Sequence, residues 1–465
     1  MLSKVFKAYD VRATYPEPLN EEIAWKVGFA SAQFLLDRVR QQGLDGPMMK
    51  HIVVGHDMRK SSPSLLQALK DGIHARGVHT IDVGMVDTPF IYFAINHLDC
   101  CGGIQVTASH NPSNYNGFKV SQVAAKPVGS GSGLEVIQEI AEGVDPNGPH
   151  EGGGQDESMD LWAAYREHLH QFLADSLLDG TRTLKVAIDA SNGMAGTMVP
   201  KVFGDVPGLQ IVPINFDNST GEFVHEPNPI VESNLAQLRE AVGAESADVG
   251  ICFDGDADRC VVVDQDGRPI GCDILLAWLA QDALAAEPGA TFIYDLRSSH
   301  AVPETIRSLG GTGVESRVGH VYMKAALNEN NAVMGGELSG HFYFRDMFCA
   351  DSGARAFAAV MTGLAHADKP LSKLIDPLMK YVQSGEINFR NEDKEGALAA
   401  LEAAFPDART EHLDGLTLEL DDFWCNVRMS NTEPLLRLNL EAADPEVVTK
   451  RLEEISPLLG ERVQE

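Results

Sequence analysis

The sequence lacks any long apolar segment. It contains no run of about eighteen apolar residues, the length that a membrane-spanning helix requires. The opening residues also lack the apolar stretch of a secretory signal peptide, and an acid and a base already follow at Asp10 and Arg12. We therefore expect a cytoplasmic protein without a membrane anchor.

Basic residues are scarce. The chain has 37 lysines and arginines against 67 aspartates and glutamates, so its formal net charge at pH 7 is −30. Nucleic acids and anionic membranes require a broad basic surface, and this charge argues against both as partners. A small anion can still bind where a few arginines and lysines converge. The bulk negative charge is best interpreted as keeping the protein soluble.

Cysteine is sparse as well, with residues at positions 100, 101, 252, 260, 272, 349 and 425. None of them forms a C-x-x-C pair and their number is odd. A disulfide framework or a zinc site is therefore not expected. Most of these cysteines should be small buried apolar side chains.

What the sequence does contain is a repeated strand–helix pattern. Its 465 residues, 44% of them hydrophobic, are enough for three or four domains with separate cores. Apolar periodicity predicts strands at 51–55, 78–83, 103–107, 184–189, 248–253, 291–294, 313–316 and 332–335. Helices are predicted after an Asn20 cap, from Ser62 to a stop at Gly77, and at 273–284. This alternation is typical of α/β domains with some parallel strand pairing.

The last hundred residues follow a different pattern, with strands at 423–429 and 435–441 before a helix at 445–459. Segments rich in Gly, Pro, Ser and acids indicate domain boundaries. We expect an α/β protein with three related mixed α/β domains and a C-terminal α+β domain. The expected bounds are 1–155, 156–256, 257–368 and 369–465.

An acidic loop, Asp254-Gly255-Asp256-Ala257-Asp258-Arg259, lies between two predicted apolar strands. Three carboxylates at alternate positions can converge on one hard cation, and Mg²⁺ prefers such oxygen ligands. An EF-hand calcium loop is excluded, because its sixth position is Arg259 and its twelfth is Gln265. An acidic turn without a ligand is the alternative, although the flanking strands disfavour free solvation of the loop.

A serine follows the predicted strand at 103–107, in Thr107-Ala108-Ser109-His110-Asn111-Pro112. The carboxyl ends of strands are where α/β proteins place their chemistry. A serine hydroxyl is a weak nucleophile that needs a base or a metal. Taken alone, the motif fits a Ser/Asn-capped turn at least as well as a nucleophile. Asn116-Gly117-Phe118-Lys119 downstream is predicted to be a glycine turn that carries a cation.

Two further loops suit a sugar phosphate. Gly335–His341 combines three glycines with Glu337, Ser339 and His341, groups that can bind sugar hydroxyls. A tight hairpin would explain its glycines but not Glu337 or His341. Arg428–Pro434 offers Arg428, Ser430, Asn431 and Thr432, which suit a dianionic phosphate, or else form a polar turn between strands.

A third group of donors is formed by Arg317, His320 and Lys324. His320 and Lys324 have the spacing of one helix face, where they could bind an anion or remain solvated.

Together, these motifs resemble the α-D-phosphohexomutase superfamily, and within it the bacterial phosphomannomutase/phosphoglucomutase group. The resemblance runs from Lys7-Ala8-Tyr9-Asp10-Val11-Arg12 to Arg428–Pro434 and so covers nearly the whole chain. It implies three related α/β domains and a mobile α+β domain, heart-shaped around a central cleft.

The resemblance also implies residue roles. Ser109 would carry the phosphoryl group, and Asp254, Asp256 and Asp258 would bind Mg²⁺ together with the Ser109 phosphate. The residues expected to act on the transferring group are Arg12, Lys119, Arg259, His320 and, as general acid or base, His341. The residues expected to bind the substrate are Tyr9, the hydroxyl readers Glu337 and Ser339, and the phosphate clamp Arg428, Ser430, Asn431 and Thr432.

The implied reaction interconverts hexose 1-phosphate and hexose 6-phosphate in two phosphoryl transfers. A hexose 1,6-bisphosphate would form, turn over in the cleft, and also serve as activator. Because Glu337 and Ser339 would bind hydroxyls away from C2, glucose and mannose phosphates are both expected substrates. The expected partners are these small sugar phosphates, with the chain acting as a monomer or a homodimer.

Two positions depart from the family pattern: Ala13 stands where Gly is common after Tyr-Asp-x-Arg, and Leu338 replaces a common Met. The second swap conserves volume. A phosphoglucosamine mutase is the closest alternative, but that group typically has Ser-Gly-Thr-Glu-Pro where this chain has Asn431, and Gln in the sugar loop.

Alternatives of other classes also exist. A phosphatase that uses phospho-Ser109 would release free phosphate. A sugar-phosphate sensor without catalytic activity is disfavoured, because Ser109 and the three aspartates of the acidic loop are all present. An aspartyl-nucleophile enzyme would have Thr or Val where this chain has Asp258.

Overall fold

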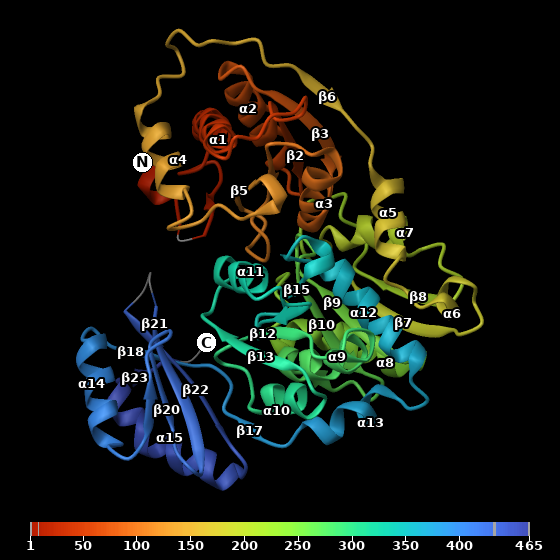
Figure 1. The fold of residues 1–465 in the computed structure, drawn as a ribbon, viewed down its shortest axis with the longest axis vertical. Coiled ribbons are helices and arrows are strands. Elements are labelled where there is room, and N and C mark those ends of the chain that lie inside the picture. The colour runs from red at the N-terminus through yellow and green to blue at the C-terminus, as the bar shows by residue number, and fades with distance from the viewer. Residues whose placement is uncertain (1, 8, 431–433, 464–465) are drawn as a thin grey trace. The chain divides into compact units, whose positions relative to one another are not determined.

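The computed structural model describes residues 2–7, 9–430 and 434–463 (Figure 1). The chain divides into two compact units. Unit 1 comprises Met1–Ile270 and Ser339–Ser372, and unit 2 comprises Gly271–Leu338 and Lys373–Glu465. Within the described residues, no helix is long and apolar enough to span a membrane. All seven cysteines are free, and all but the partly exposed Cys349 are buried, as predicted.

The first sheet of unit 1 is mixed. Its strand order is β1 (Val11–Thr14), β5 (Tyr115–Gln122), β4 (Gly102–Val106), β2 (His51–His56), β3 (His79–Met85) and β6 (Asp156–Ser158). β2 pairs in parallel with β3 and β4, whereas β5 runs antiparallel to β4 and β1. The predicted strands are confirmed here, with ends within two residues of those expected.

The predicted glycine turn at 116–119 is wrong, because these residues lie inside β5. Gly117 pairs with Arg12 of β1, and a Cβ at Gly117 would lie 2.1 Å from the Val11 carbonyl oxygen. The glycine therefore permits close strand packing rather than a turn. As a result, Lys119 lies in a strand that is paired on both sides within the sheet.

Helices pack against this sheet: α1 (Glu21–Gln41), α2 (Ser62–Ala75), α3 (Thr88–Leu98) and α4 (Leu134–Gly143). The predicted Asn20 cap is confirmed, since its Oδ1 accepts a hydrogen bond of 3.1 Å from the Ile23 amide. α1 and α2 cross at two glycines. A Cβ at Gly28 would lie 2.1 Å from the Leu69 carbonyl oxygen, and one at Gly72 would lie 2.0 Å from that of Trp25.

The second sheet of unit 1 carries the acidic loop. Its order is β11 (Pro269–Ile270), β10 (Cys260–Asp264), β9 (Val249–Phe253), β7 (Leu184–Asp189) and β8 (Leu209–Ile214). β9 and β10 are antiparallel, and every residue of both is buried. The loop between them, 254–259, is therefore held at both ends by core strands, as its sequence predicted.

Five helices and a short strand pair complete unit 1. The helices are α5 (Trp162–His170), α6 (Asp175–Leu178), α7 (Ala195–Val202), α8 (Ala236–Glu245) and α12 (Gly353–His366), and the antiparallel pair is β15 (Phe342–Phe344) with β16 (Ala350–Asp351). Helix α13 (Leu371–Ile375) spans the boundary between the units.

Unit 2 contains a parallel group of strands, in the order β13 (Thr312–Ser316), β12 (Thr291–Asp295) and β14 (Met334–Gly336). Its accompanying helices are α9 (Cys272–Ala286), α10 (Ala301–Ser308) and α11 (His320–Glu329).

The C-terminal sheet of unit 2 is antiparallel, and α14 (Lys394–Ala404) and α15 (Pro445–Leu459) accompany it (Figure 1). Its order is β19 (Arg409–Glu411), β20 (Leu416–Glu419), β21 (Phe423–Met429), β22 (Leu435–Ala442), β18 (Ile387–Arg390) and β23 (Glu461–Arg462), with β17 (Val382–Gln383) also on β22. The predicted strand at 423–429 and helix at 445–459 are confirmed residue for residue. The predicted class, three mixed α/β domains followed by an α+β domain, is also confirmed.

Gly28→Ala should destabilise the first domain by about 1–3 kcal/mol, because the new methyl group must displace a helix backbone rather than a flexible side chain. Urea denaturation of the whole chain would measure the loss. Gly243→Ala is the matched control, since Gly243 is an exposed residue of α8 with no atom within 4 Å of its Cβ position. That control should stabilise by about 0.4–1 kcal/mol. Equal stability of the two variants would contradict the crossing geometry.

Candidate active site

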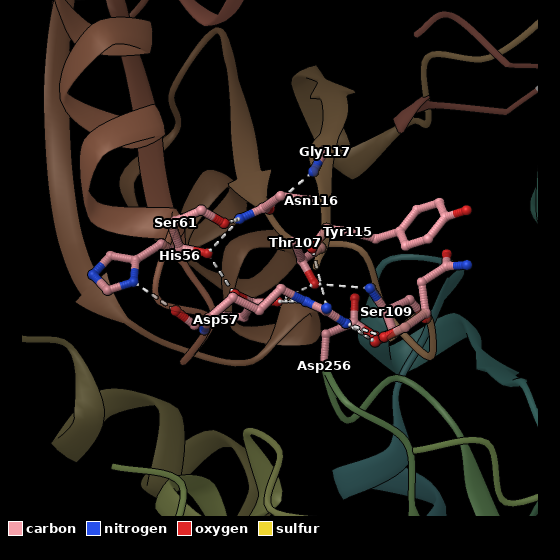
Figure 2. Close-up of polar contacts among 12 residues, drawn as sticks. His56, Asp57, Ser61, Thr107, Ser109, Tyr115, Asn116, Gly117 and Asp256 are labelled. Atoms are coloured by element: carbon pink, nitrogen blue, oxygen red, sulfur yellow. Dashed lines mark hydrogen bonds and ion pairs between the residues drawn. The ribbon is translucent and has the colours of Figure 1, made fainter. Parts of the chain in front are cut away.

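The predicted nucleophile lies just beyond the end of β4. Ser109 adopts a positive φ of 49°, which is uncommon for a residue with a side chain. It is only 2% exposed, and its Oγ donates a hydrogen bond of 2.9 Å to Oδ2 of Asp254. The serine loop of the first sheet and the acidic loop of the second sheet therefore meet within unit 1 (Figure 2).

The acidic loop gathers its carboxylates in one place. Asp254, Asp256 and Asp258 are at most 1% exposed, and one oxygen from each lies within 4.8 Å of the others. Among the described residues, Oδ1 of Asp256 has no hydrogen-bond partner. Burial, together with the neighbouring Asp258 and Asp256, raises the pKa of Asp254 well above its usual range. These residues fit a divalent cation, which would supply the positive charge that buried carboxylates lack.

Lys119 and Arg12 bring positive charge to this cluster. Lys119 Nζ donates to Oδ2 of Asp256 at 2.7 Å and to Oδ2 of Asp258 at 2.6 Å. Burial alone would lower the pKa of Lys119, but the two carboxylates outweigh it and the pKa is raised. Arg12 donates to Asn111 Oδ1 at 2.8 Å and pairs with Asp10.

Arg259 and His341 lie on the other side of the cluster. The Arg259 Nε donates to His341 Nε2 at 3.4 Å, and the same histidine nitrogen lies 3.3 Å from Oδ1 of Asp258. Ser339 Oγ lies 2.8 Å from Nδ1 of His341. The loop that carries Ser339 and His341 therefore contacts the acidic loop directly.

Sequence reasoning gave no role to His110. Its Nδ1 lies 3.0 Å from Arg259 Nη2 and 3.4 Å from Ser109 Oγ. The Arg259 charge, with burial, holds the pKa of His110 well below its usual range, so the imidazole is neutral at pH 7. Its position directly after Ser109 was the available signal.

Other predicted residues lie in unit 2. Glu337 is 3% exposed, and its Oε1 accepts a hydrogen bond of 2.8 Å from the Gly319 amide, one residue before His320 begins α11. Arg428 Nη2 donates to Oε2 of Glu386 at 2.9 Å. Ser430, which follows β21, is buried.

Sequence reasoning also missed Arg297. Its Nη2 pairs with Oδ2 of Asp295 at 2.7 Å, and its Nη1 lies 3.6 Å from the same Glu386 oxygen that Arg428 contacts. Both arginines thus contact the Glu386 carboxylate in unit 2, and Arg437 Nη1 lies 3.6 Å from its other oxygen, Oε1. An unremarkable Leu-Arg-Ser-Ser sequence after β12 gave no signal for this.

The predicted residues thus fall into two groups. Unit 1 holds Tyr9, Arg12, Ser109, Lys119, Asp254, Asp256, Asp258, Arg259, Ser339 and His341, and unit 2 holds His320, Glu337, Arg428 and Ser430. The prediction that Asn431 and Thr432 bind phosphate falls outside the described residues.

Known proteins match the chain over almost all of its length. The descriptions "Phosphoglucomutase/phosphomannomutase, alpha/beta/alpha domain I", II and III match residues 3–146, 163–267 and 272–382, and the C-terminal domain of the same name matches 386–458. The chain belongs to the phosphoglucomutase/phosphomannomutase family.

Members of this family with similar sequences are named as mutases. A protein of Xanthomonas campestris pv. campestris named "Phosphohexose mutases" is 37% identical over 99% of this chain and 100% of its own length. A phosphomannomutase of Escherichia coli strain K12 is 35% identical over 98% of this chain and 99% of its own. The solved structure of a family protein from Burkholderia thailandensis has a TM-score of 0.87 at 33% identity, covering 99% of this chain and 98% of that one. The phosphohexomutase resemblance is confirmed, and the protein is a mutase.

In this mutase, Asp256→Asn should weaken divalent-cation binding on the order of 100-fold, because it removes one of three converging charges. Calorimetric titration of the whole protein with Mg²⁺ would measure the change. Asp266→Asn, an exposed acid in the next turn of the same sheet, is the matched control and should leave the affinity unchanged. Equal affinities for the two variants would rule out the acidic loop as the cation site.

Proposed function

We propose that the protein interconverts hexose 1-phosphate and hexose 6-phosphate, with glucose and mannose as the sugars, through a phosphoserine at Ser109. The observation that carries this proposal is the 2.9 Å contact between Ser109 Oγ and Asp254, with both side chains buried. It brings a hydroxyl to a cluster of three carboxylates suited to a cation. Phosphoryl transfer needs little else besides positioning and charge stabilisation.

Mg²⁺ is the cation that we propose for Asp254, Asp256, Asp258 and the Ser109 phosphate, because three carboxylate oxygens leave room for phosphate oxygen and water. When bound, it would neutralise charge on the transferring group. Around it, Lys119 and Arg259 supply fixed positive charge beside the carboxylates. The burial of Arg259 and the partial burial of Lys119 strengthen that charge by limiting the access of water.

His341 is the proton carrier that we propose for the sugar hydroxyl. Its Nδ1 is held by Ser339 and its Nε2 lies by Asp258 and Arg259, so the ring orientation is fixed from both sides. A histidine held in this way can take a proton from an attacking hydroxyl and return one to a leaving oxygen.

The residues of unit 2 are proposed to bind the rest of the substrate. Arg428 is buried and Arg297 is partly buried beside Asp295, and both contact the Glu386 carboxylate, an arrangement suited to the non-reacting phosphate. Ser430, Asn431 and Thr432 would complete that clamp. Glu337 would bind sugar hydroxyls and His320 the reacting phosphate, and a hexose 1,6-bisphosphate would be both intermediate and activator.

Other activities predict different products. A phosphatase would release inorganic phosphate from the sugar, and a phosphoglucosamine mutase would act on glucosamine 1-phosphate. The names of the relatives above favour the hexose mutase. A coupled assay with glucose 1-phosphate, mannose 1-phosphate and glucosamine 1-phosphate in parallel, with free phosphate measured, separates these activities.

Ser109→Ala should lower turnover by at least about 10⁴-fold while leaving the affinity for glucose 1-phosphate intact, because the hydroxyl is needed for transfer and not for binding. Turnover in the coupled assay and affinity by calorimetry would measure the two effects. Ser113→Ala, in the same loop, is the control and should retain activity. A mutase rate near that of the unmodified protein in Ser109→Ala would refute the phosphoserine.

Glu337→Ala should raise the KM for hexose phosphates about 10–100-fold, since a charge-assisted hydrogen bond to a hydroxyl contributes roughly 1.5–3 kcal/mol. Steady-state kinetics with both epimers would measure it. Exposed Glu329→Ala, at the end of α11, is the control and should behave like the unmodified protein. Unaltered kinetics in Glu337→Ala would remove the hydroxyl-binding role.

A further inference from the structure

One buried arginine forms several hydrogen bonds to the backbone of the loop that carries Ser109. The Arg59 side chain is fully buried, and its Nη2 donates to the carbonyl oxygens of Ser109 at 2.8 Å and Asn111 at 2.7 Å. Its Nη1 donates to the carbonyl oxygens of Pro112 at 2.5 Å and Tyr115 at 3.1 Å. A single guanidinium therefore binds four backbone carbonyls between residues 109 and 115.

Asp57 fixes this guanidinium and the start of the loop together. Its Oδ2 accepts from Arg59 Nε at 3.0 Å and from Thr107 Oγ1 at 2.7 Å (Figure 2). Thr107 Oγ1 in turn accepts a hydrogen bond of 3.0 Å from the Ser109 amide. Ser109 is thus held at its amide through Thr107 and at its carbonyl through Arg59.

Two further contacts set where this carbonyl lies. A Cβ at Gly255 of the acidic loop would come within 2.4 Å of the Ser109 carbonyl oxygen, so the two loops touch through their backbones. The Phe223 ring covers the guanidinium at 5.1 Å. The oxygen that Arg59 binds is therefore packed against the acidic loop.

This arrangement accounts for the unusual backbone of Ser109. A residue with a side chain adopts a positive φ only where its surroundings over-determine the conformation. The rigid fork of an arginine can do this, because its donors are fixed in one plane, whereas a lysine presents a single ammonium group. Because Arg59 directs its donors to the backbone carbonyls of this loop, its buried ion pair with Asp57 fixes the position of the loop.

We infer that Arg59 is a positioning residue for phosphoryl transfer, which fixes Ser109 Oγ against the acidic loop by holding the Ser109 carbonyl. The inference rests on the proposed phosphoserine mechanism. Arg59 contacts the Ser109 loop through its backbone carbonyls, and the proposed phosphate clamp lies in unit 2. Loss of the Arg59 guanidinium should therefore slow phosphoryl transfer without weakening substrate binding. An error of about 1 Å in a reacting group can cost on the order of 100-fold in rate.

The test compares Arg59→Lys with the unmodified protein and with Arg76→Lys. Arg76 lies in the same domain and pairs with the exposed Glu151, so the control makes the same substitution away from the loop. We expect kcat to fall about 100-fold in Arg59→Lys, with KM within about threefold, and no change in Arg76→Lys. Phosphorylation of Ser109 by glucose 1,6-bisphosphate in a single turnover should slow by the same factor.

A second pair of variants covers the case in which Arg59→Lys does not fold. Thr107→Val removes the hydroxyl between Asp57 and the Ser109 amide with little change in volume, whereas Thr107→Ser keeps it. We expect a loss of about 10-fold or more in kcat for Thr107→Val and recovery of the rate in Thr107→Ser. If these residues only supported folding, the variants would lower the unfolding midpoint, but kcat would not fall selectively with KM unchanged.

Normal kcat in folded Arg59→Lys, or losses in KM rather than kcat, would overturn the inference. So would equal rates in Thr107→Val and Thr107→Ser. Mass spectrometry of the unmodified protein after incubation with glucose 1,6-bisphosphate separates this result from the proposed function. An absence of phosphoserine there would reject the proposed mechanism itself, whereas normal phosphorylation of both the unmodified protein and Arg59→Lys would reject only the role of Arg59.

Discussion

The structure depends on the confinement of three carboxylates in a loop without access to water. Asp254, Asp256 and Asp258 are buried together, and such charges are tolerated only when opposite charge is close by. Lys119 and Arg259 supply part of it. The same need for compensating positive charge makes the loop suited to a divalent cation.

The fold meets this need by bringing together segments that are distant along the chain. The first sheet contributes Ser109 beyond β4 and Lys119 from β5, and the second sheet contributes the acidic loop between β9 and β10. The chain then returns after residue 338 to contribute His341, which forms a backbone bridge with Arg259. All of these groups lie in one compact unit.

Much of this could be predicted from sequence because it is local. Apolar periodicity identified the strands on both sides of the acidic loop, and alternate aspartates indicated that their carboxylates converge. Local reasoning failed at Gly117, which resembles a turn residue but allows β1 to approach β5. It did not find Arg59 or Arg297. Each pairs with an aspartate two residues before it, but the backbone carbonyls of the serine loop and the distant Glu386 that they also contact leave no pattern in the sequence. Sequence reasoning also could not predict which of the two compact units each candidate residue belongs to, because the units are defined by long-range contacts.

The backbone contact between Gly255 and Ser109 constrains how a mutase can act at both ends of a sugar. Because Ser109 is packed against the acidic loop, its side chain has little freedom to move. Under the proposed mechanism, carbon 1 and carbon 6 of the sugar would each have to reach this one hydroxyl, so the sugar would reorient between the two transfers while the serine loop stays in place.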